Sequence, residues 1–297
     1  MQRLEPLTFK PVYQAYVWGG ERIRTEYGRN ETPIPCAESW EIADRPEGMS
    51  QVLNGPFADA SLNELVTMYG EKLLGKDRKE KRFPLLIKLI DARAHLSVQV
   101  HPSEESSERC GGEPKTEAWF LLEDGPLYAG FKRPSSKKEL LEAIREERAQ
   151  ELLQKIDGKR GDLFFIPGGR IHAIGAGCMI FEVQQNSNTT YRVYDWGRKD
   201  RTLHLEEACS CIKFDDTANP KVKSLLVEES GPMRRSTLLS TLFFSVEKIE
   251  LEERTQIECD PRTFQVFFDL KKGKTVLLPA ESEPVDLPAG SYLSLYI

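Results

Sequence analysis

The chain has 297 residues, of which 39% are hydrophobic and 30% charged, and its 41 basic and 47 acidic residues leave a net charge of −6. This length allows one elaborated domain or two, and the composition is typical of globular proteins rather than disordered or fibrous ones. Because the chain is acidic, we do not expect it to bind nucleic acid. Its apolar runs are all well short of the roughly 18 residues of a membrane-spanning helix, so we do not expect it to bind a membrane. The net charge still allows a local basic pocket that binds a small anion.

The cysteines and the first residues both indicate a cytoplasmic protein. Six cysteines are dispersed without a C-x-x-C motif: Cys36, Cys110, Cys178, Cys209, Cys211 and Cys259. Cys209 and Cys211 are two apart, but no second pair completes a zinc ribbon, so we expect inert thiols in a reducing compartment. The N-terminal stretch lacks the apolar core of a signal peptide.

The first part of the chain predicts short strands and a helix. Residues 1–20 carry two prolines and four aromatic side chains and end in two glycines, which indicates an extended segment packed on a sheet. Residues 39–42 alternate polar and apolar side chains, as strands do. Apolar spacing over residues 61–74 predicts a helix whose N-cap is Asp59 or Ser61.

The middle of the chain combines strand signals with a helical insertion. Residues 83–90 form a dense apolar run that only Lys88 interrupts, and strand character resumes over residues 117–122. Residues 135–156 are charged and have helical spacing, so we expect one or two surface helices there.

Strand signals dominate the rest of the chain, over residues 162–194 and from residue 238 onward, with turn residues between them. Many short strands of this kind predict a mainly β fold, an antiparallel barrel or sandwich with helical insertions. Mixed charge over residues 215–237 suggests a connector. The expected organisation is therefore a domain over residues 1–214 and a smaller β-rich region over residues 238–297.

Two short stretches fit together as halves of one metal site. Gln99 and His101 are two apart in a β-branched run, so on a strand their side chains share one face. Residues 161–172 predict a strand, a tight Pro-Gly turn and a second strand that opens with His172. Glu117, at the start of another strand, is a candidate for a charged oxygen ligand. Two imidazoles, a carboxylate and an amide suit catalytic zinc, although manganese, iron or cobalt accept the same ligands.

The order of Gly161, Pro167 and His172 resembles the second motif of the cupin superfamily, with Ala176 where an asparagine is usual. Gln99 replaces the first histidine of the first cupin motif. This departure resembles the type I mannose-6-phosphate isomerases, or phosphomannose isomerases, in their short prokaryotic form. Family signatures follow in family order over about residues 10–210: Trp18-Gly19-Gly20, Glu38-Ser39-Trp40-Glu41-Ile42, Leu86-Ile87-Lys88, Ser97-Val98-Gln99-Val100-His101-Pro102, Lys115-Thr116-Glu117-Ala118-Trp119, Ile171-His172-Ala173-Ile174-Gly175-Ala176-Gly177 and Gln185-Asn186-Ser187-Asn188-Thr189-Thr190-Tyr191-Arg192-Val193-Tyr194-Asp195.

The resemblance implies a cupin-like β-barrel or jelly roll that interconverts mannose 6-phosphate and fructose 6-phosphate through an enediol. Arg192 matches the family's essential active-site arginine, and Lys88 and Lys115 match lysines assigned to its active site. The implied substrate is a small phosphorylated sugar, and the implied assembly is a monomer or a homodimer. Carried over by position, the resemblance implies one Zn²⁺ per chain with the ligands Gln99, His101, Glu117 and His172.

Several of these residues also have a purely structural interpretation. Lys88 suits a half-buried lysine whose charged end reaches water. Arg192 suits a surface salt bridge. Trp18 and Trp119 suit packing better than a platform for a sugar ring.

One departure from the family concerns proton transfer. Many relatives have an aspartate four positions before the arginine, where this chain has Asn188. An amide does not titrate near neutral pH, so either another group such as a lysine or a metal-bound water transfers the proton, or the activity is altered. Asp195 is a candidate substitute carboxylate, or the structural partner of Arg192. The alternatives to an isomerase are a non-catalytic sugar-phosphate-binding cupin, which Asn188 admits, and a less favoured metal-dependent cupin oxygenase.

Overall fold

The computed structural model describes residues 3–297, and the chain divides into two compact units. Unit 1 comprises the chain up to Val12 together with Trp40–Leu86 and Val222–Ile297, and unit 2 comprises Tyr13–Ser39 and Ile87–Lys221. Each unit is assembled from separate segments, whereas the expected domains are continuous stretches. Independent domains with those expected boundaries stay a prediction.

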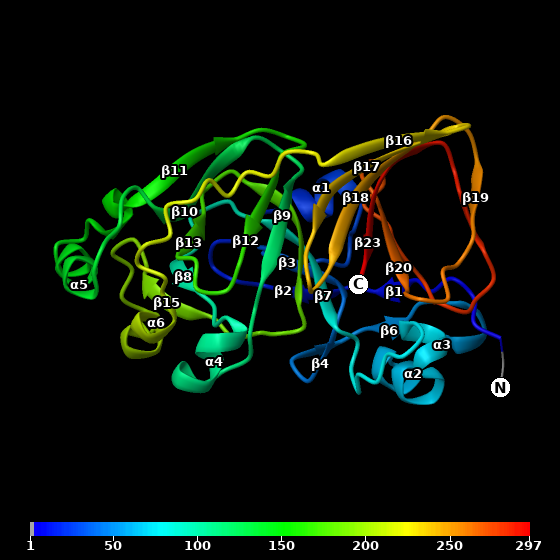
Figure 1. Cartoon of the computed structure of the whole chain (residues 1–297), viewed down its shortest axis with the longest axis horizontal. Helices are drawn as coiled ribbons and strands as arrows, with labels where there is room; N and C mark the ends of the chain where they lie inside the picture. Colours follow the sequence, from blue (N-terminus) through cyan, green and yellow to red (C-terminus); the bar gives the residue numbers. More distant parts are fainter. Residues whose placement is uncertain (1–2) are drawn as a thin grey trace. The chain divides into compact units, whose positions relative to one another are not determined.

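Two sheets of mainly antiparallel strands build unit 2 (Figure 1). The five-stranded sheet has the order β11-β10-β13-β8-β15, and the six-stranded sheet has the order β12-β9-β14-β7-β3-β2. The chain passes between the two units within β2, β3 and β7. The strands are β2 (Val12–Gln14), β3 (Glu38–Ile42), β7 (Leu85–Asp91), β8 (Val98–Val100), β9 (Glu117–Leu121), β10 (Gly125–Phe131), β11 (Leu153–Gly158), β12 (Leu163–Ile166), β13 (His172–Ile174), β14 (Met179–Gln185) and β15 (Tyr191–Tyr194).

A buried core lies between these two sheets. Trp119 and Phe164 enter it from β9 and β12, and Leu127 and Ile174 enter it from β10 and β13. Because successive side chains of a strand point to opposite faces, this inner core determines which residues of each strand face the interior of unit 2.

The other face of the five-stranded sheet is covered by helices. Val98 and Val100 of β8 share a second buried cluster with side chains of α4 (Glu104–Cys110), α5 (Lys137–Arg145) and α6 (Leu205–Cys211). Ser103 opens α4 with a capping box, and its hydroxyl accepts a hydrogen bond from the backbone N–H of Ser106. The remaining helix of unit 2 is α1 (Arg22–Tyr27).

The helical prediction over residues 135–156 is confirmed for α5 and for the 3-10 turn η2 (Ala149–Leu152), but it is wrong for the last residues, which begin β11. Leu153 packs in the outer cluster and Ile156 against the inner core. Side chains three apart lie on opposite faces of a strand but on one face of a helix. Both faces of this sheet are covered, so a strand can bury both side chains. The apolar spacing of a helix therefore also occurs in this strand.

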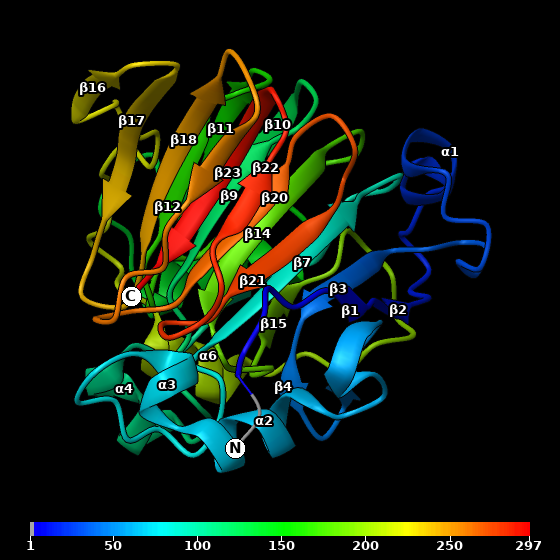
Figure 2. The same cartoon turned by 90° about the vertical axis from the view of Figure 1, so that its right-hand side faces the viewer.

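Unit 1 contains a six-stranded antiparallel sheet of the order β16-β17-β18-β23-β20-β21, and Figure 2 shows β17, β18 and β23 side by side in it. Two-stranded pairs β1-β6, β4-β5 and β19-β22 complete its strands. The bounds are β1 (Phe9–Lys10), β4 (Asp44–Arg45), β5 (Gly48–Met49), β6 (Gln51–Val52), β16 (Leu226–Ser230), β17 (Met233–Ser240), β18 (Ser245–Leu251), β19 (Thr255–Ile257), β20 (Gln265–Asp269), β21 (Thr275–Leu278), β22 (Val285–Leu287) and β23 (Gly290–Tyr296).

The helix expected over residues 61–74 of unit 1 forms as two helices, α2 (Leu62–Tyr69) and α3 (Glu71–Leu74), which follow the 3-10 turn η1 (Gly55–Phe57). Ser61 is the N-cap rather than Asp59, because its hydroxyl and the Glu64 carboxylate form a reciprocal capping box. Gly70 interrupts the helix with a φ of 47°, a conformation that glycine adopts without steric cost.

The second half of the expected connector over residues 215–237 forms a hairpin instead. β16 pairs with β17, and this register places Glu228 opposite Arg235 and Glu229 opposite Arg234. Opposite charges that face each other across two strands stabilise the pairing. The mixed charge that suggested a connector is therefore the pattern of a solvent-exposed hairpin.

The predicted fold class, mainly β with antiparallel sheets and helical insertions, is confirmed. Between residues 3 and 297, none of the helices combines the length and the apolar character that crossing a membrane requires.

Candidate metal centre and active-site pocket

The four predicted metal ligands come from three strands whose pairing brings them together inside unit 2. Gln99 of β8 lies directly opposite His172, the first residue of β13. His101 follows β8 immediately, and Glu117 is the first residue of β9 in the other sheet. Val98 and Val100 point to the outer cluster, so the alternation along β8 directs Gln99 inward.

Three of these residues converge on one point. The Nε2 atom of His101 lies 3.4 Å from one carboxylate oxygen of Glu117, and the Nε2 atom of His172 lies 3.4 Å from the other. One ligand atom from each of the three lies within 4.8 Å of the others, and all three side chains are buried. The amide nitrogen of Gln99 lies 3.3 Å from Nε2 of His172, and a half-turn of the amide would present its oxygen there instead.

The protonation of this group favours metal binding. Nδ1 of His172 donates a hydrogen bond to the carbonyl oxygen of Arg170 over 2.9 Å, so the lone pair of Nε2 faces Glu117. Burial and the nearby Lys115 lower the pKa of His101 to about 3, and burial also lowers the pKa of His172. Burial alone would raise the pKa of Glu117, but Lys115 and His101 hold it well below its usual range. Neutral imidazoles and an ionised carboxylate are the forms that bind a metal ion.

Unsatisfied polar atoms support the same conclusion. Both ring nitrogens of His101 are buried without a hydrogen-bond partner among residues 3–297, and the Glu117 oxygen nearest to His101 has only the ammonium group of Lys115 beside it as an opposite charge. Buried polar atoms normally have a partner, and an uncompensated group costs about 1–3 kcal/mol. Lone pairs directed at one another repel unless a cation lies between them. The residues present therefore fit a divalent metal ion with nitrogen and oxygen ligands.

The two predicted lysines are buried among carboxylates. Nζ of Lys115 lies 3.2 Å from Glu117, and Nζ of Lys88 lies 3.4 Å from both Glu38 and Glu182. Burial opposes the charge of Lys88, but Glu38, Glu182 and Glu117 outweigh it and raise its pKa. The interpretation of Lys88 as a half-buried lysine that reaches water is therefore wrong.

A pocket of about 340 Å³ opens beside the candidate metal centre within unit 2. Gln99 lines it and belongs to both features. Its charged lining consists of the cations Lys88, Lys115, Arg192 and Arg201 and the carboxylates Glu38 and Glu182. Asn188 and Trp18 also line it, whereas Trp119 is fully buried and donates its indole N–H to Glu182 over 2.9 Å.

Arg192 lies next to two of the candidate metal ligands in the five-stranded sheet. The register of β15 on β8 places it opposite Gln99, which in turn lies opposite His172. Its Nη1 donates to the carbonyl oxygen of Thr202 over 2.8 Å, and its Nε has no partner in the part of the chain that the structure describes. Burial and the neighbouring Arg201 lower the pKa of Arg192.

Asp195 has other partners than the sequence suggested. Its buried carboxylate accepts hydrogen bonds from Arg198 over 2.6 Å and from Nε of Arg201 over 2.8 Å. It therefore orients Arg201, which lines the pocket. Sequence reasoning missed Arg201 and Glu182. A single carboxylate within the apolar run of β14 was the available signal for Glu182, whereas nothing local distinguishes Arg201 from a surface arginine.

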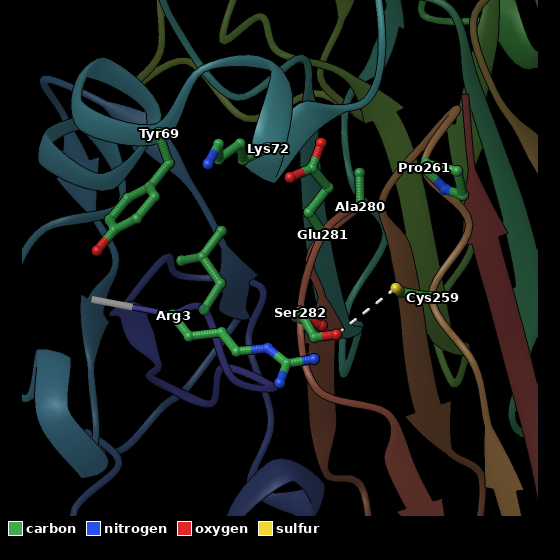
Figure 3. A pocket seen from close by; sticks show the side chains of 9 residues that line it. Arg3, Tyr69, Lys72, Cys259, Pro261, Ala280, Glu281 and Ser282 are labelled. Carbon is green, nitrogen blue, oxygen red and sulfur yellow. Dashed lines mark hydrogen bonds between the residues drawn. The ribbon is translucent and has the colours of Figure 1, made fainter. Parts of the chain in front are cut away.

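A second cavity, of about 520 Å³, lies in unit 1 (Figure 3). Arg3, Tyr69, Lys72 and Glu281 are among the residues that line it, and the thiol of Cys259 contacts the carbonyl oxygen of Ser282. Its nine lining residues include none of the four candidate metal ligands, whereas Gln99 lines the pocket of unit 2. Of these two cavities, the pocket of unit 2 is therefore the one that adjoins the candidate metal centre.

Comparisons with known proteins agree with the resemblance noted in the sequence. A family model described as the phosphomannose isomerase type I catalytic domain matches residues 7–126. The mannose-6-phosphate isomerase of Streptococcus mutans is 37% identical over 262 residues, which cover 86% of this chain and 81% of that protein. The mannose-6-phosphate isomerase ManA of Bacillus subtilis is 34% identical over 299 residues, which cover 93% of both proteins.

Solved structures show the same fold. The crystal structure of the mannose 6-phosphate isomerase from Bacillus subtilis superposes with a TM-score of 0.89 at 28% identity, over 99% of this chain and 100% of that one. A putative mannosephosphate isomerase from Archaeoglobus fulgidus has a TM-score of 0.74 at 22% identity, over 100% of this chain and 98% of that one. The prediction made from the motifs is confirmed: the chain belongs to the type I phosphomannose isomerase family.

Proposed function

We propose that this chain interconverts mannose 6-phosphate and fructose 6-phosphate, moving a proton between C1 and C2 through an enediol. The observation that carries the proposal is the junction of two features at Gln99. The amide of Gln99 lies 3.3 Å from His172, which belongs to the candidate metal group with His101 and Glu117, and the same residue lines a pocket of about 340 Å³ that also contains four cationic side chains.

Zinc is the proposed metal, with Gln99, His101, Glu117 and His172 as its ligands. Imidazole and carboxylate ligands without a thiolate are typical of catalytic rather than structural zinc. When bound, zinc would supply Lewis-acid stabilisation for the negative charge that the enediolate carries on its oxygens.

The phosphate group is proposed to bind Arg192 and Arg201. Both guanidinium groups line the pocket, and burial and the neighbouring Arg201 lower the pKa of Arg192, so a dianion placed between the two arginines would relieve their repulsion. Lys88 and Lys115 already neutralise carboxylates, which makes them less suited to this task. We assign them to the reacting end of the substrate, where their ammonium groups can donate to its oxygens.

Proton transfer is proposed to use Glu182. Asn188 lines the pocket but does not titrate, and the carboxylate of Asp195 is engaged by two arginines. Glu182 lines the pocket, and burial and Glu117 raise its pKa. A carboxylate with a raised pKa is a stronger base once ionised, and the protonated Lys88 beside it is placed to protonate a substrate oxygen.

A coupled assay on metal-quantified protein tests this function. We expect mannose 6-phosphate to be converted to fructose 6-phosphate by protein that holds one zinc per chain, and we expect the activity to disappear after chelation and to return on adding zinc. Full activity in metal-free protein would refute the metal's role. The Asn188→Asp variant, measured in the same assay, tests whether the missing family aspartate limits turnover. A higher kcat in this variant would show that Asn188 lowers the rate.

The non-catalytic alternative makes a different prediction. Binding of mannose 6-phosphate without conversion, in protein loaded with zinc, would favour a sugar-phosphate-binding cupin. Iron in the purified protein with oxygen consumption would favour the oxygenase. We also propose a cytoplasmic location, which fits the free state of all six cysteines. The proposed assembly is a monomer or a homodimer.

A further inference from the structure

Two cysteine thiols that the isomerase site does not use are in contact inside unit 2. Cys110 is the last residue of α4, and Cys211 is the last residue of α6. The thiol of Cys211 lies 2.7 Å from the sulfur of Cys110, although 101 positions separate the two residues in the sequence. Both side chains are buried, Cys110 at 8% exposure and Cys211 at 3%.

This contact distinguishes the pair from other thiols of the chain. The thiols of Cys36, Cys178 and Cys259 contact backbone carbonyl oxygens, which cannot react with them. The thiol of Cys110 also contacts a carbonyl oxygen, that of Ser106, but it has the sulfur of Cys211 beside it as well. Cys209 lies in α6 only two positions from Cys211, and a helix turns it to another face. The sequence predicted six inert thiols, and the packing of α4 against α6 gives two of them a partner.

We propose that Cys110 and Cys211 are a reversible disulfide site that responds to small disulfides such as oxidised glutathione. The thiolate of Cys110 attacks the oxidant, the S–S bond of the oxidant breaks, and the first small thiol leaves with a proton. Cys211 then attacks the sulfur of Cys110, its own proton leaves, and the second small thiol is released. The two cysteines are oxidised to one disulfide, and one small disulfide is reduced to two thiols.

The chain next to Cys110 explains how an oxidant can reach a buried pair. Gly111 and Gly112 follow Cys110, are exposed, and have φ values of 70° and 79°. Because glycine adopts such angles freely, this end of α4 can open without strain in the backbone. Burial raises the pKa of Cys211, so its attack on the mixed disulfide is expected to accelerate in alkaline solution.

The pair is also connected to the active-site pocket. The Tyr191 hydroxyl donates to the carbonyl oxygens of Cys110 and Gly111 over 2.8 and 2.6 Å, and Arg192 is the next residue of β15. In the other direction, the glycines lead to Lys115 and to Glu117, a member of the candidate metal group. A bond that ties α4 to α6 therefore restrains both segments that supply charged groups to the pocket.

The test uses the zinc-loaded full chain, incubated with oxidised glutathione at mildly alkaline pH. Peptide mapping is expected to find Cys110 joined to Cys211, with the loss of two hydrogen atoms, and dithiothreitol is expected to reverse it. Amide hydrogen exchange over residues 104–112 should slow on oxidation. The kcat/KM for mannose 6-phosphate should fall by about tenfold, because small displacements of catalytic groups are costly.

Variants separate the pair from general oxidation. Cys209→Ser should keep the full response, whereas Cys110→Ser should abolish it. If the Cys110→Ser variant does not fold, Cys211→Ala provides the same test. Stable glutathione adducts on Cys110 without a cross-link, or thiols that stay reduced, would overturn the disulfide site. A disulfide that leaves both hydrogen exchange and kcat/KM unchanged would overturn its connection to the pocket. The mapping requires no isomerase activity, so it also distinguishes failure of this inference from failure of the proposed function.

Discussion

Replacing Glu182 with glutamine tests the proposed base with little change of shape. The amide oxygen can still accept the indole N–H of Trp119, which the carboxylate binds over 2.9 Å. Lys88 loses one of its carboxylates but keeps Glu38 at 3.4 Å. We therefore expect a folded, zinc-binding variant whose free energy of unfolding falls by about 1–3 kcal/mol.

The catalytic loss should be much larger than the structural one. A positioned general base contributes roughly 10²–10⁴-fold to a rate, so kcat of Glu182→Gln should fall by that factor while KM changes little. Exchange of the C2 hydrogen of the substrate with solvent should fall in parallel. Glu247→Gln, which changes a buried carboxylate of unit 1, is the matched control and should keep its kcat.

The pH dependence gives an independent measure. A base acts only when it is deprotonated, and burial raises the pKa of Glu182, so activity of the unmodified chain should fall as the pH drops through that raised pKa. This acid limb should vanish from whatever activity remains in Glu182→Gln. A zinc-loaded Glu182→Gln protein that keeps more than about a tenth of the normal kcat would contradict the assignment of the base.

Other changes address the metal, the anion site and the core. His172→Ala removes one of three convergent ligands, so metal analysis should find well below one zinc per chain and the coupled assay no turnover; retention of full zinc would contradict the ligand set. Arg192→Lys keeps the charge but loses the forked guanidinium, and kcat/KM should fall by about tenfold or more with zinc content unchanged. Phe164→Ala opens a cavity in the core between the sheets and should lower the free energy of unfolding in urea by about 3–5 kcal/mol, whereas Leu242→Ala, at a side chain that is 98% exposed, should change it by less than about 0.5 kcal/mol.

Several errors of the sequence interpretation share one cause. The apolar spacing of residues 153–156 is that of a helix, and the mixed charge of residues 226–237 is typical of a connector. A local pattern of this kind does not show which other segments pack against it. The strand β11 is stabilised by two different clusters, and the β16–β17 hairpin by charges on the facing strand. The clusters that stabilise β11 include residues far away in the sequence, whereas the charges that stabilise the hairpin lie on the next strand and meet only once the register of β16 on β17 is formed.

The candidate metal ligands could be found early because their information is local. The two-residue spacing of Gln99 and His101 places both on one face of any strand, and the glycines and proline before His172 indicate a turn whatever the rest of the chain does. Residue type then restricts the chemistry, since imidazoles and a carboxylate suit a divalent metal. A mainly β fold follows from the same periodicity.

Only the tertiary structure shows which residues contact one another at the candidate site. Only the register of β13 and β15 on β8 places His172 and Arg192 on either side of Gln99, and only the two facing sheets bring Glu117 to them. The ion pairs of Lys88 and the contact between Cys110 and Cys211 likewise join segments that are distant in the chain. Strand register and helix packing depend on the complementarity of whole surfaces, and no local spacing of residues contains that information.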